Sequence, residues 1–382
     1  MISIYIHWPF CKSKCPYCDF NSHISKEINE DSWLRAYKAE LDSQLHTFKG
    51  QKIRSIFFGG GTPSLMPPHI AAFILEYIAK YADLSPDTEI TLEANPTSSE
   101  SKNFKAFKDA GINRLSIGVQ SFDEKRLQFL GREHNLAESL KAIELASGLF
   151  SRFSFDMIYA TPHQTLNMWE NELKQAVSFA AEHISLYQLT IEKGTKFYIQ
   201  HSRGEFEMPS SDLADDLYEA TEDILSPYGL EMYEISNYAK KGFESQHNLS
   251  YWRYQDYIGI GPGAHSRISD NNRMHAFYMI HNPNSWLKAN LETGSAMQNS
   301  SILTKEELLT EILMMGLRLK DGIDHSNLQK FFGKNFDELI RPEYIKMLVD
   351  NKLLSYDTNN IKLTKSGLKL HQSIMRGMVT PI

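Results

Sequence analysis

The amino-acid sequence predicts an α/β fold built on a parallel β-sheet. Short β-rich runs alternate with helical patterns through the first half of the chain, which gives six strand-then-helix units in succession. Parallel strands joined by helices form either an open doubly wound sheet or a barrel, and periodicity does not choose between the two. Glycine and polar residues recur where these strands end. Because barrel active sites are assembled at the carboxyl ends of strands, this recurrence favours the barrel.

The predicted strands are short and β-rich, and the helices after them carry an apolar stripe. The six strands are residues 2–7, 53–58, 89–93, 114–119, 154–159 and 183–189. The helices are residues 31–48, 69–81, 99–110, 124–130, 136–147 and 168–180. From 193 to 290 the pattern is less regular, with a helix at 211–226 and a strand at 232–236.

The chain changes character after residue 300. Helices are expected at 305–319 and 336–351, a hairpin from 353–356 and 361–363, and a last helix at 365–375. This order resembles a small winged-helix-like α+β domain. We therefore predict a main domain at 1–295 and a smaller one at 300–382, with a structural or lid role for the second.

Composition excludes several classes of protein. The net charge is −7, and the segment after residue 300 holds 12 Lys/Arg against 10 Asp/Glu, too weak a positive charge for duplex binding, so no nucleic-acid partner is expected. No signal peptide is evident, and no apolar run approaches the roughly 20 residues of a membrane helix. With only three cysteines, too closely spaced to staple distant segments, we expect a reducing compartment, the cytoplasm.

The three cysteines form the most specific motif, Cys11-x-x-x-Cys15-x-x-Cys18, directly after the first strand. Three thiolates are one short of a closed zinc site or a four-cysteine iron–sulfur cluster. They therefore hold either a [4Fe–4S] cluster whose fourth iron is left to S-adenosylmethionine, or zinc with His7 or His23 as a fourth ligand. The spacing favours the iron–sulfur cluster.

A glycine run follows the second strand, Phe58-Gly59-Gly60-Gly61-Thr62-Pro63. Glycines let the backbone approach a ligand closely and adopt positive φ. Alone, such a run is often only a tight turn. At the exit of the strand next to the cysteine loop, it is a candidate cradle for S-adenosylmethionine.

These motifs together resemble a known superfamily. The segments that carry the resemblance are Tyr5-Ile6-His7-Trp8-Pro9-Phe10-Cys11, the cysteine spacing, Gly59-Gly60-Gly61-Thr62-Pro63 and Gly118-Val119-Gln120-Ser121-Phe122. They are similar to radical S-adenosylmethionine proteins, in the branch that contains oxygen-independent coproporphyrinogen III oxidase and the HemW heme chaperones. The resemblance covers nearly the whole chain and implies a partial (β/α)6 barrel.

The resemblance also implies roles for individual residues. The [4Fe–4S] cluster would be held by Cys11, Cys15 and Cys18. The S-adenosylmethionine site would be lined by Tyr5, Tyr17, Gly60, Gly61 and Thr62, and contacted by Glu93, Gln120, Arg132 and Asp156. The chemistry is suitable, because a carboxylate holds an ammonium, a guanidinium pairs with a carboxylate, and Asp156 accepts from ribose hydroxyls. Taken alone, Glu93 would instead form an interior salt bridge, and Arg132 would cap a helix.

Three features separate the branches. The oxidases carry a fourth cysteine where this chain has Phe20, and an extension before the first strand, which begins here at Ile2. HemW-type proteins carry a His-Asn-x-x-Tyr-Trp motif, found here from His247 to Trp252. A histidine can ligate heme iron and aromatic rings can face a porphyrin. His247 is therefore a candidate iron ligand, although the motif alone would be interpreted as a packed aromatic cluster.

Two positions depart from the family pattern, and one turn has an open role. Where the family reads Tyr-Gly-Leu-Pro-Gly-Gln, Ala160 and His163 replace the glycines. The glycine-rich turn at 259–266 either completes the cleft, with His265 near S-adenosylmethionine, or is a plain loop.

The sequence therefore predicts a radical S-adenosylmethionine-type heme chaperone that binds heme and passes it to an acceptor protein, with an electron donor for its cluster. One alternative is oxidative decarboxylation of coproporphyrinogen III. A zinc-stabilised winged-helix regulator is a second alternative, and the weak charge of the last domain argues against it. Which protein accepts the heme is left open.

Overall fold

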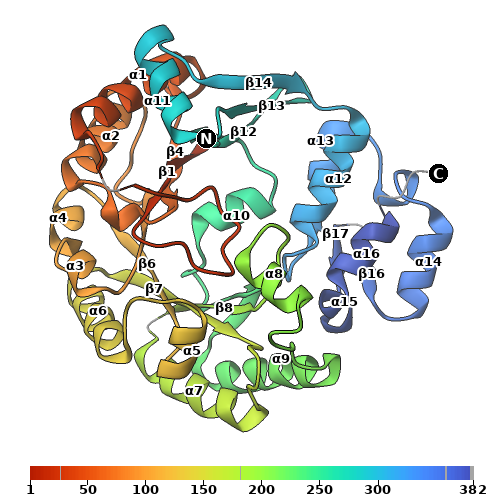
Figure 1. Ribbon diagram of the computed structural model, residues 1–382. Helices are drawn as coiled ribbons and strands as arrows, with labels where there is room; N and C mark the ends of the chain where they lie inside the picture. The colour runs from red at the N-terminus through yellow and green to blue at the C-terminus, as the bar shows by residue number, and fades with distance from the viewer. Residues whose placement is uncertain (26, 181, 358, 379–382) are drawn as a thin grey trace.

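A curved parallel sheet forms the centre of the computed structural model, which describes residues 1–25, 27–180, 182–357 and 359–378 (Figure 1). Its strands are β1 (Ile2–Trp8), β4 (Ile53–Gly60), β5 (Glu89–Ala94), β6 (Arg114–Gln120), β7 (Arg152–Tyr159) and β8 (His183–Gln188). They pair in this order, each parallel to the next. The six predicted strands are thus confirmed, and the fold is a partial (β/α)6 barrel.

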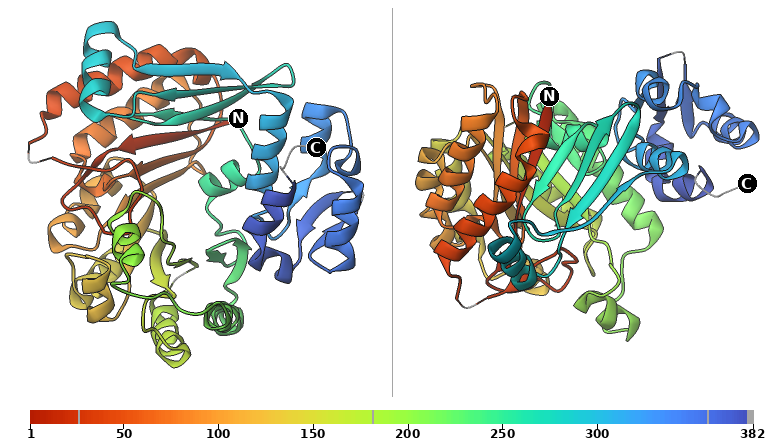
Figure 2. Two further views of the ribbon diagram at one scale, coloured as in Figure 1. Left: turned by 45° about the vertical axis from the view of Figure 1, so that its right-hand side comes forward. Right: turned by 90° about the horizontal axis from the view of Figure 1, so that it is seen from above.

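Helices cover the outside of this sheet, as both views in Figure 2 show. They are α1 (Glu30–Phe48), α2 (Pro68–Tyr81), α3 (Ser98–Ser101), α4 (Phe104–Asp109), α5 (Glu124–Phe129), α6 (Leu136–Leu149) and α7 (Leu166–Phe179). The helix predicted at 99–110 is divided in two. Buried Glu100 accepts hydrogen bonds from Ser64 and Thr97 and anchors α3, whereas α4 packs through Phe104 and Phe107.

Further strands extend the sheet at both ends. Beside β1 lies parallel β11 (Tyr257–Ile260), followed by antiparallel β12 (His265–Asp270), β13 (Arg273–Met279) and β14 (Met297–Ile302). Beside β8 lie β10 (Asn237–Ala239) and β9 (Glu231–Glu234). The remaining strands and α-helices between residues 10 and 293 are β2 (Phe10–Cys11), β3 (His23–Ile24), α8 (Lys196–Ser202), α9 (Ser211–Leu225), α10 (Gln246–Trp252) and α11 (Pro283–Thr293).

A buried carboxylate connects three of these elements. Glu40 of α1 is fully buried, and it accepts hydrogen bonds from the Gly261 amide at 2.6 Å, from Asn290 Nδ2 at 3.1 Å and from the Trp286 indole. Burial raises the pKa of Glu40 from 4.5 to about 7, against the opposing effect of these donors. The carboxylate therefore fixes the turn after β11, which in turn holds the end of the cysteine loop through Asn21 Nδ2 and the Pro262 carbonyl at 2.9 Å.

The chain after β14 forms a small winged-helix-like arrangement of helices and a three-stranded sheet. Its elements are α12 (Lys305–Gly316), β15 (Ile323–Asp324), α13 (His325–Phe332), α14 (Pro342–Asp350), β16 (Leu354–Tyr356), β17 (Asn360–Leu363), α15 (Lys365–Lys369) and α16 (His371–Met378). The sheet order is β15-β17-β16. The helix predicted at 336–351 begins only at Pro342, because proline favours the first turn of a helix and restricts the residue before it.

The predicted division near residue 300 falls between β14 and α12. No helix among the described residues combines the length and the apolar character that a membrane crossing requires.

Candidate functional site

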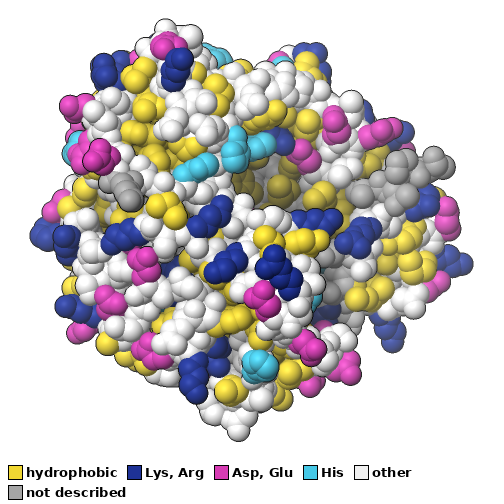
Figure 3. Space-filling view, in the orientation of Figure 1, with side chains coloured by type: hydrophobic (Ala, Val, Ile, Leu, Met, Phe, Trp, Pro, Cys, Tyr) yellow, Lys and Arg dark blue, Asp and Glu magenta, His cyan; other side chains and the backbone are white. Residues whose placement is uncertain are grey.

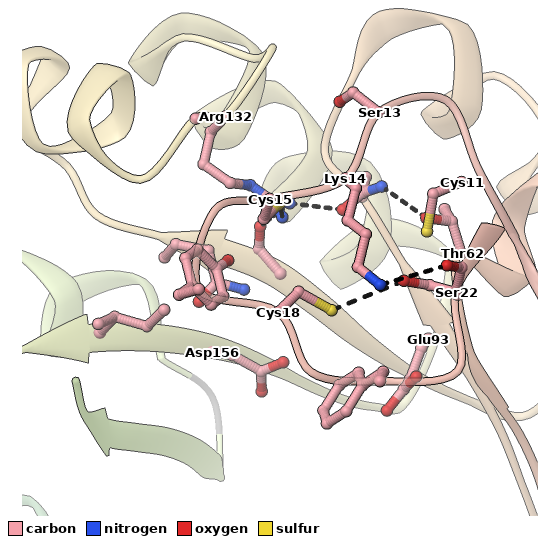
Figure 4. A pocket seen from close by; sticks show the side chains of 18 of the residues that line it. Cys11, Ser13, Lys14, Cys15, Cys18, Ser22, Thr62, Glu93, Arg132 and Asp156 are labelled. Atoms are coloured by element: carbon pink, nitrogen blue, oxygen red, sulfur yellow. Dashed lines mark hydrogen bonds between the residues drawn. The ribbon is translucent and has the colours of Figure 1, made fainter. Parts of the chain in front are cut away.

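The three cysteines lie on the loop between β1 and α1, which we call the cysteine loop (residues 9–24). All three are half-buried and none is in a disulfide. Their side chains face a cavity of about 320 Å³ at the carboxyl ends of β4 to β8 (Figure 4). Its lining includes 11 of the 14 predicted site residues: Cys11, Cys15, Cys18, Tyr17, Gly60, Gly61, Thr62, Glu93, Gln120, Arg132 and Asp156.

The donor set suits a four-iron cube better than a single zinc ion. Among the residues that the structure describes, no three histidine, cysteine, aspartate or glutamate side chains are arranged to hold one ion. His7, a proposed fourth zinc ligand, has both ring nitrogens hydrogen-bonded, to the Tyr5 hydroxyl at 3.0 Å and to the Asn21 carbonyl at 2.9 Å. Zinc ligands converge on one ion, whereas the cysteines of a cube bind different irons. Figure 4 shows the three sulfur atoms spread around the loop.

The glycine run has a packing role that the sequence did not reveal. Gly60 has φ +116°, and a Cβ there would lie 2.5 Å from the His7 ring. A Cβ on Gly61 would lie 2.8 Å from the Phe10 carbonyl oxygen. The Thr62 amide donates to that same oxygen at 2.8 Å, and the Thr62 hydroxyl donates to Cys11 Sγ at 3.3 Å. The run therefore lets the cysteine loop pack directly against the exit of β4.

Two carboxyl groups face the cavity from β5 and β7. Burial and the charge of Asp156 raise the pKa of Glu93 to about 8, and burial raises the pKa of Asp156 to about 6. Glu93 accepts a hydrogen bond from the Gly60 amide at 3.3 Å, and Asp156 accepts one from Ser116 at 3.3 Å. A cationic or hydroxyl-bearing ligand in the cavity would favour the ionised form of both groups.

Arg132 lies above the cavity and contacts the cysteine loop. Its Nη1 donates to Cys15 Sγ at 3.3 Å, and its Nη2 donates to the Gly118 carbonyl at 2.9 Å and to Asn95 Oδ1 at 2.5 Å. Its Nε is buried and has no hydrogen-bond partner in the described part of the chain. An unpartnered buried guanidinium nitrogen is costly, so this group is suited to an anionic ligand.

Gln120 and Tyr17 line the same cavity, whereas Tyr5 and His265 do not. Gln120 adopts φ +68° at the end of β6, and its Nε2 would lie 2.9 Å from a Cβ on Gly118. Tyr5 lies deeper, in a second cavity that shares Glu93 and Asp156 with the first. His265 is exposed on β12, where its ring stacks on Tyr278 at 5.2 Å.

His247 lies at the opposite end of the barrel from the cysteines. Its backbone amide donates to Glu89 at the start of β5, and its Nδ1 is hydrogen-bonded to Ser55 in β4 at 2.9 Å. Its Nε2 is hydrogen-bonded to the Tyr251 hydroxyl at 3.0 Å. The side chain is buried beside a cavity of about 160 Å³. In this conformation His247 has no free ring nitrogen for iron.

The two glycine replacements keep the backbone that glycine would adopt. Ala160 has φ +56° and His163 has φ +62°, both in the left-handed region. The Gln164 amide donates to the Thr161 carbonyl at 3.1 Å, which closes a turn with His163 at its third position. That position of a type II turn requires positive φ and favours glycine. Ala160 and His163 therefore hold a backbone conformation that favours glycine, at a cost in strain.

The sequence analysis assigned no role to several residues that line the cavity. Asn95 bonds both Arg132 and Thr62, the latter at 3.2 Å from Nδ2 to Oγ1. The position of Asn95 directly after β5, at the carboxyl end of a strand, could have identified it as a candidate site residue. Tyr187, Gln188 and Leu189 line the cavity from the end of β8. They follow a predicted strand as well, but carry no distinctive motif.

Comparisons with known proteins found matches to two family models and to several curated proteins. The profile described as "Radical SAM superfamily" matches residues 5–176, and "HemN C-terminal domain" matches residues 303–370. "Heme chaperone HemW" of Escherichia coli (strain K12) is 43% identical over 70% of each chain. "Heme chaperone HemW" of Bacillus subtilis (strain 168) is 32% identical over 98% of each chain.

Two further matches extend over most of the chain. "Radical S-adenosyl methionine domain-containing protein 1, mitochondrial" of Bos taurus is 36% identical over 99% of this chain and 87% of its own length. Among solved structures, coproporphyrinogen III oxidase (HemN) from Escherichia coli matches with a TM-score of 0.82 at 21% identity, over 99% of this chain and 90% of that one. This structural likeness shows the fold.

Proposed function

Because the chain belongs to the radical SAM superfamily, in the HemW branch, we propose that it is a heme chaperone that binds a [4Fe–4S] cluster, S-adenosylmethionine and heme. It would deliver the heme to an acceptor protein. The observation that carries the proposal is the set of three free thiols of one loop at the mouth of a cavity lined by Arg132, Glu93 and Asp156.

The cysteine loop would hold the cluster. Cys11, Cys15 and Cys18 would each bind one iron, which leaves one iron without a protein ligand. Such a cluster, when bound and reduced, would supply an electron to the sulfonium of S-adenosylmethionine. Burial raises the pKa of the Cys11 thiol to about 11, so in the absence of metal this thiol keeps its proton. Cluster binding would therefore release that proton.

The other cavity residues would position S-adenosylmethionine. Glu93 would hold its ammonium group, Arg132 its carboxylate, and Asp156 its ribose hydroxyls. Gln120, Tyr17 and the glycine run would shape the walls. Tyr5 would support Glu93 from the inner cavity, and His265 would take part only if the turn before β12 moved toward the mouth.

Heme binding is proposed from the relatives named heme chaperone. His247 would be the iron ligand only if α10 left the end of the barrel, because both of its ring nitrogens are engaged. His247→Ala tests this assignment. If heme retention by the variant equals that of the parent protein, His247 is not the ligand.

Anaerobic reconstitution with iron and sulfide, followed by titration with S-adenosylmethionine and then heme, tests the whole proposal. We expect the EPR signal of a reduced [4Fe–4S] cluster, a change in that signal on addition of S-adenosylmethionine, and a heme absorption band. Cys15→Ser serves as the matched control that lacks one cluster ligand. Absence of the cluster, or a cluster signal that ignores S-adenosylmethionine, would contradict the proposal.

The proposal includes an electron donor for the cluster and a reducing compartment, which we propose to be the cytoplasm. It also separates the chain from the oxidases of the same branch. Phe20 stands where those proteins carry a fourth cysteine. An anaerobic assay with reductant, S-adenosylmethionine and coproporphyrinogen III should therefore give no protoporphyrinogen IX.

A further inference from the structure

We infer that heme binds at the rim of the barrel mouth, on a surface formed by the end of the cysteine loop and the turn before α11. This rim surface consists of Lys14, Phe20, His23, Ile24 and His281. The inference rests on the proposed heme binding and adds to it a location and an iron ligand. Figure 3 shows histidine side chains gathered beside a hollow on this face of the molecule.

The rim surface exposes two large apolar side chains that the described residues leave mostly uncovered. Ile24 is 62% exposed and Phe20 is 61% exposed, and no other large hydrophobic side chain among the described residues is more exposed. They lie on either side of His23 in the sequence. Exposed apolar side chains in the same loop as an available imidazole favour an apolar ligand, because covering them removes apolar area from water. A porphyrin offers such a flat apolar face.

Two imidazoles on the same surface are available to iron. His281 is exposed, and no hydrogen bond to its ring nitrogens is found among the described residues. Its ring lies 6.3 Å from that of His23, centre to centre. His23 Nε2 is hydrogen-bonded to Asn21 Oδ1 at 2.8 Å, which leaves Nδ1 of His23 for a ligand. A hydrogen bond to the far nitrogen is the usual way in which a protein orients a histidine that binds metal.

The two segments of the rim are held together by a shared side chain. Asn21 Nδ2 donates to the carbonyl of His281 at 3.0 Å and to that of Pro262 at 2.9 Å. The surface is therefore formed before any ligand arrives, which lowers the entropic cost of binding. His247, by contrast, becomes accessible only after α10 has moved.

The charge of the rim suits the propionate groups of heme. Lys14 is exposed, and its Nζ contacts the Ser22 carbonyl at 3.5 Å, next to His23. None of the salt bridges found among the described residues involves it. An unpaired ammonium beside an imidazole and two apolar side chains matches a ligand that combines iron, a flat apolar ring and carboxylates.

Heme titration of the cluster-loaded protein and of the His23→Ala/His281→Ala double variant tests the inference. We expect the double variant to lose about tenfold or more in heme affinity. The absorption and EPR spectra of its ferric heme should also lose the signature of histidine ligation. Phe20→Ser should weaken binding and leave that signature intact. His46→Ala, which removes an exposed histidine of α1, is the matched control and should leave affinity and spectra unchanged.

The outcomes separate this inference from the proposed function. If the parent protein binds no heme, the heme part of the proposed function fails and the inference fails with it. If the parent protein binds heme and the double variant binds it equally with the same spectrum, only the inference fails. Loss of heme in His247→Ala together with an unchanged double variant would place the iron at α10. S-adenosylmethionine binding by the double variant checks that its cavity is intact.

Discussion

Replacing Glu40 by glutamine should remove part of the dependence of the free energy of unfolding on pH. The folded protein holds the Glu40 proton up to about pH 7, whereas the ordinary value for a glutamate is 4.5. The folded state therefore binds this proton more tightly than the unfolded chain does between those two pH values. Stability must fall as pH rises through this window. Glu40→Gln is neutral throughout and escapes that loss.

The size of the effect follows from the two pKa values. Between pH 5 and pH 8, ionisation of Glu40 costs roughly 2.5 kcal/mol of unfolding free energy in the parent protein. The variant has a separate, constant cost, because an amide nitrogen cannot accept the hydrogen bonds of Trp286 and Asn290. That cost is about 1–3 kcal/mol. The variant should therefore be less stable at pH 5 and approach or exceed the parent protein at pH 8.

Urea unfolding of the cluster-loaded protein at pH 5, 6, 7 and 8, followed by tryptophan fluorescence, measures this difference. Both proteins lose the cluster on unfolding, so its contribution cancels when their free energies of unfolding are compared. Glu76→Gln, an exposed position of α2, controls for the substitution itself. A difference between variant and parent that stays constant across the four pH values would refute the reasoning.

The remaining predictions concern the site and its backbone. Cys15→Ser should lose the iron–sulfur absorption and still fold, because no disulfide supports the chain. Circular dichroism measures the folding of the variant and iron analysis measures its cluster content. A cluster retained by the variant would contradict the prediction. Asp156→Asn should weaken S-adenosylmethionine binding about tenfold in calorimetry while the cluster stays, since an amide accepts more weakly than a carboxylate; unchanged affinity would remove Asp156 from the site. His163→Gly should stabilise the protein by about 0.5–1 kcal/mol in urea unfolding, because relief of left-handed strain exceeds the entropy of glycine. His163→Ala keeps the Cβ and should give no gain, so equal effects of the two variants would exclude strain as the cause.

Much of the fold and of the candidate site could be predicted from local pattern. The six parallel strands appear in the sequence as short β-rich runs, and the cavity residues follow them because carboxyl ends of parallel strands meet at one edge. The extension of the sheet could not be predicted in this way. All residues of β14 are exposed, so no alternation of buried and exposed positions marks it as a strand.

Long-range contacts explain the other differences. The sequence places His247 in an aromatic motif and His281 in an unremarkable turn. Tertiary contacts bury His247 at one end of the barrel, where it is hydrogen-bonded to Ser55. They place His281 on the rim surface beside His23. Ala160 and His163 likewise differ from glycine in sequence and match it in backbone conformation.

The sequence by itself determined the cysteine loop, the order of the strands and the family, because each is carried by residues close together in the chain. The tertiary structure alone decided which side chains are accessible at the two ends of the barrel. The physical reason is that burial and hydrogen-bond partners depend on segments that meet only after β11 pairs with β1 and α10 covers the strand ends.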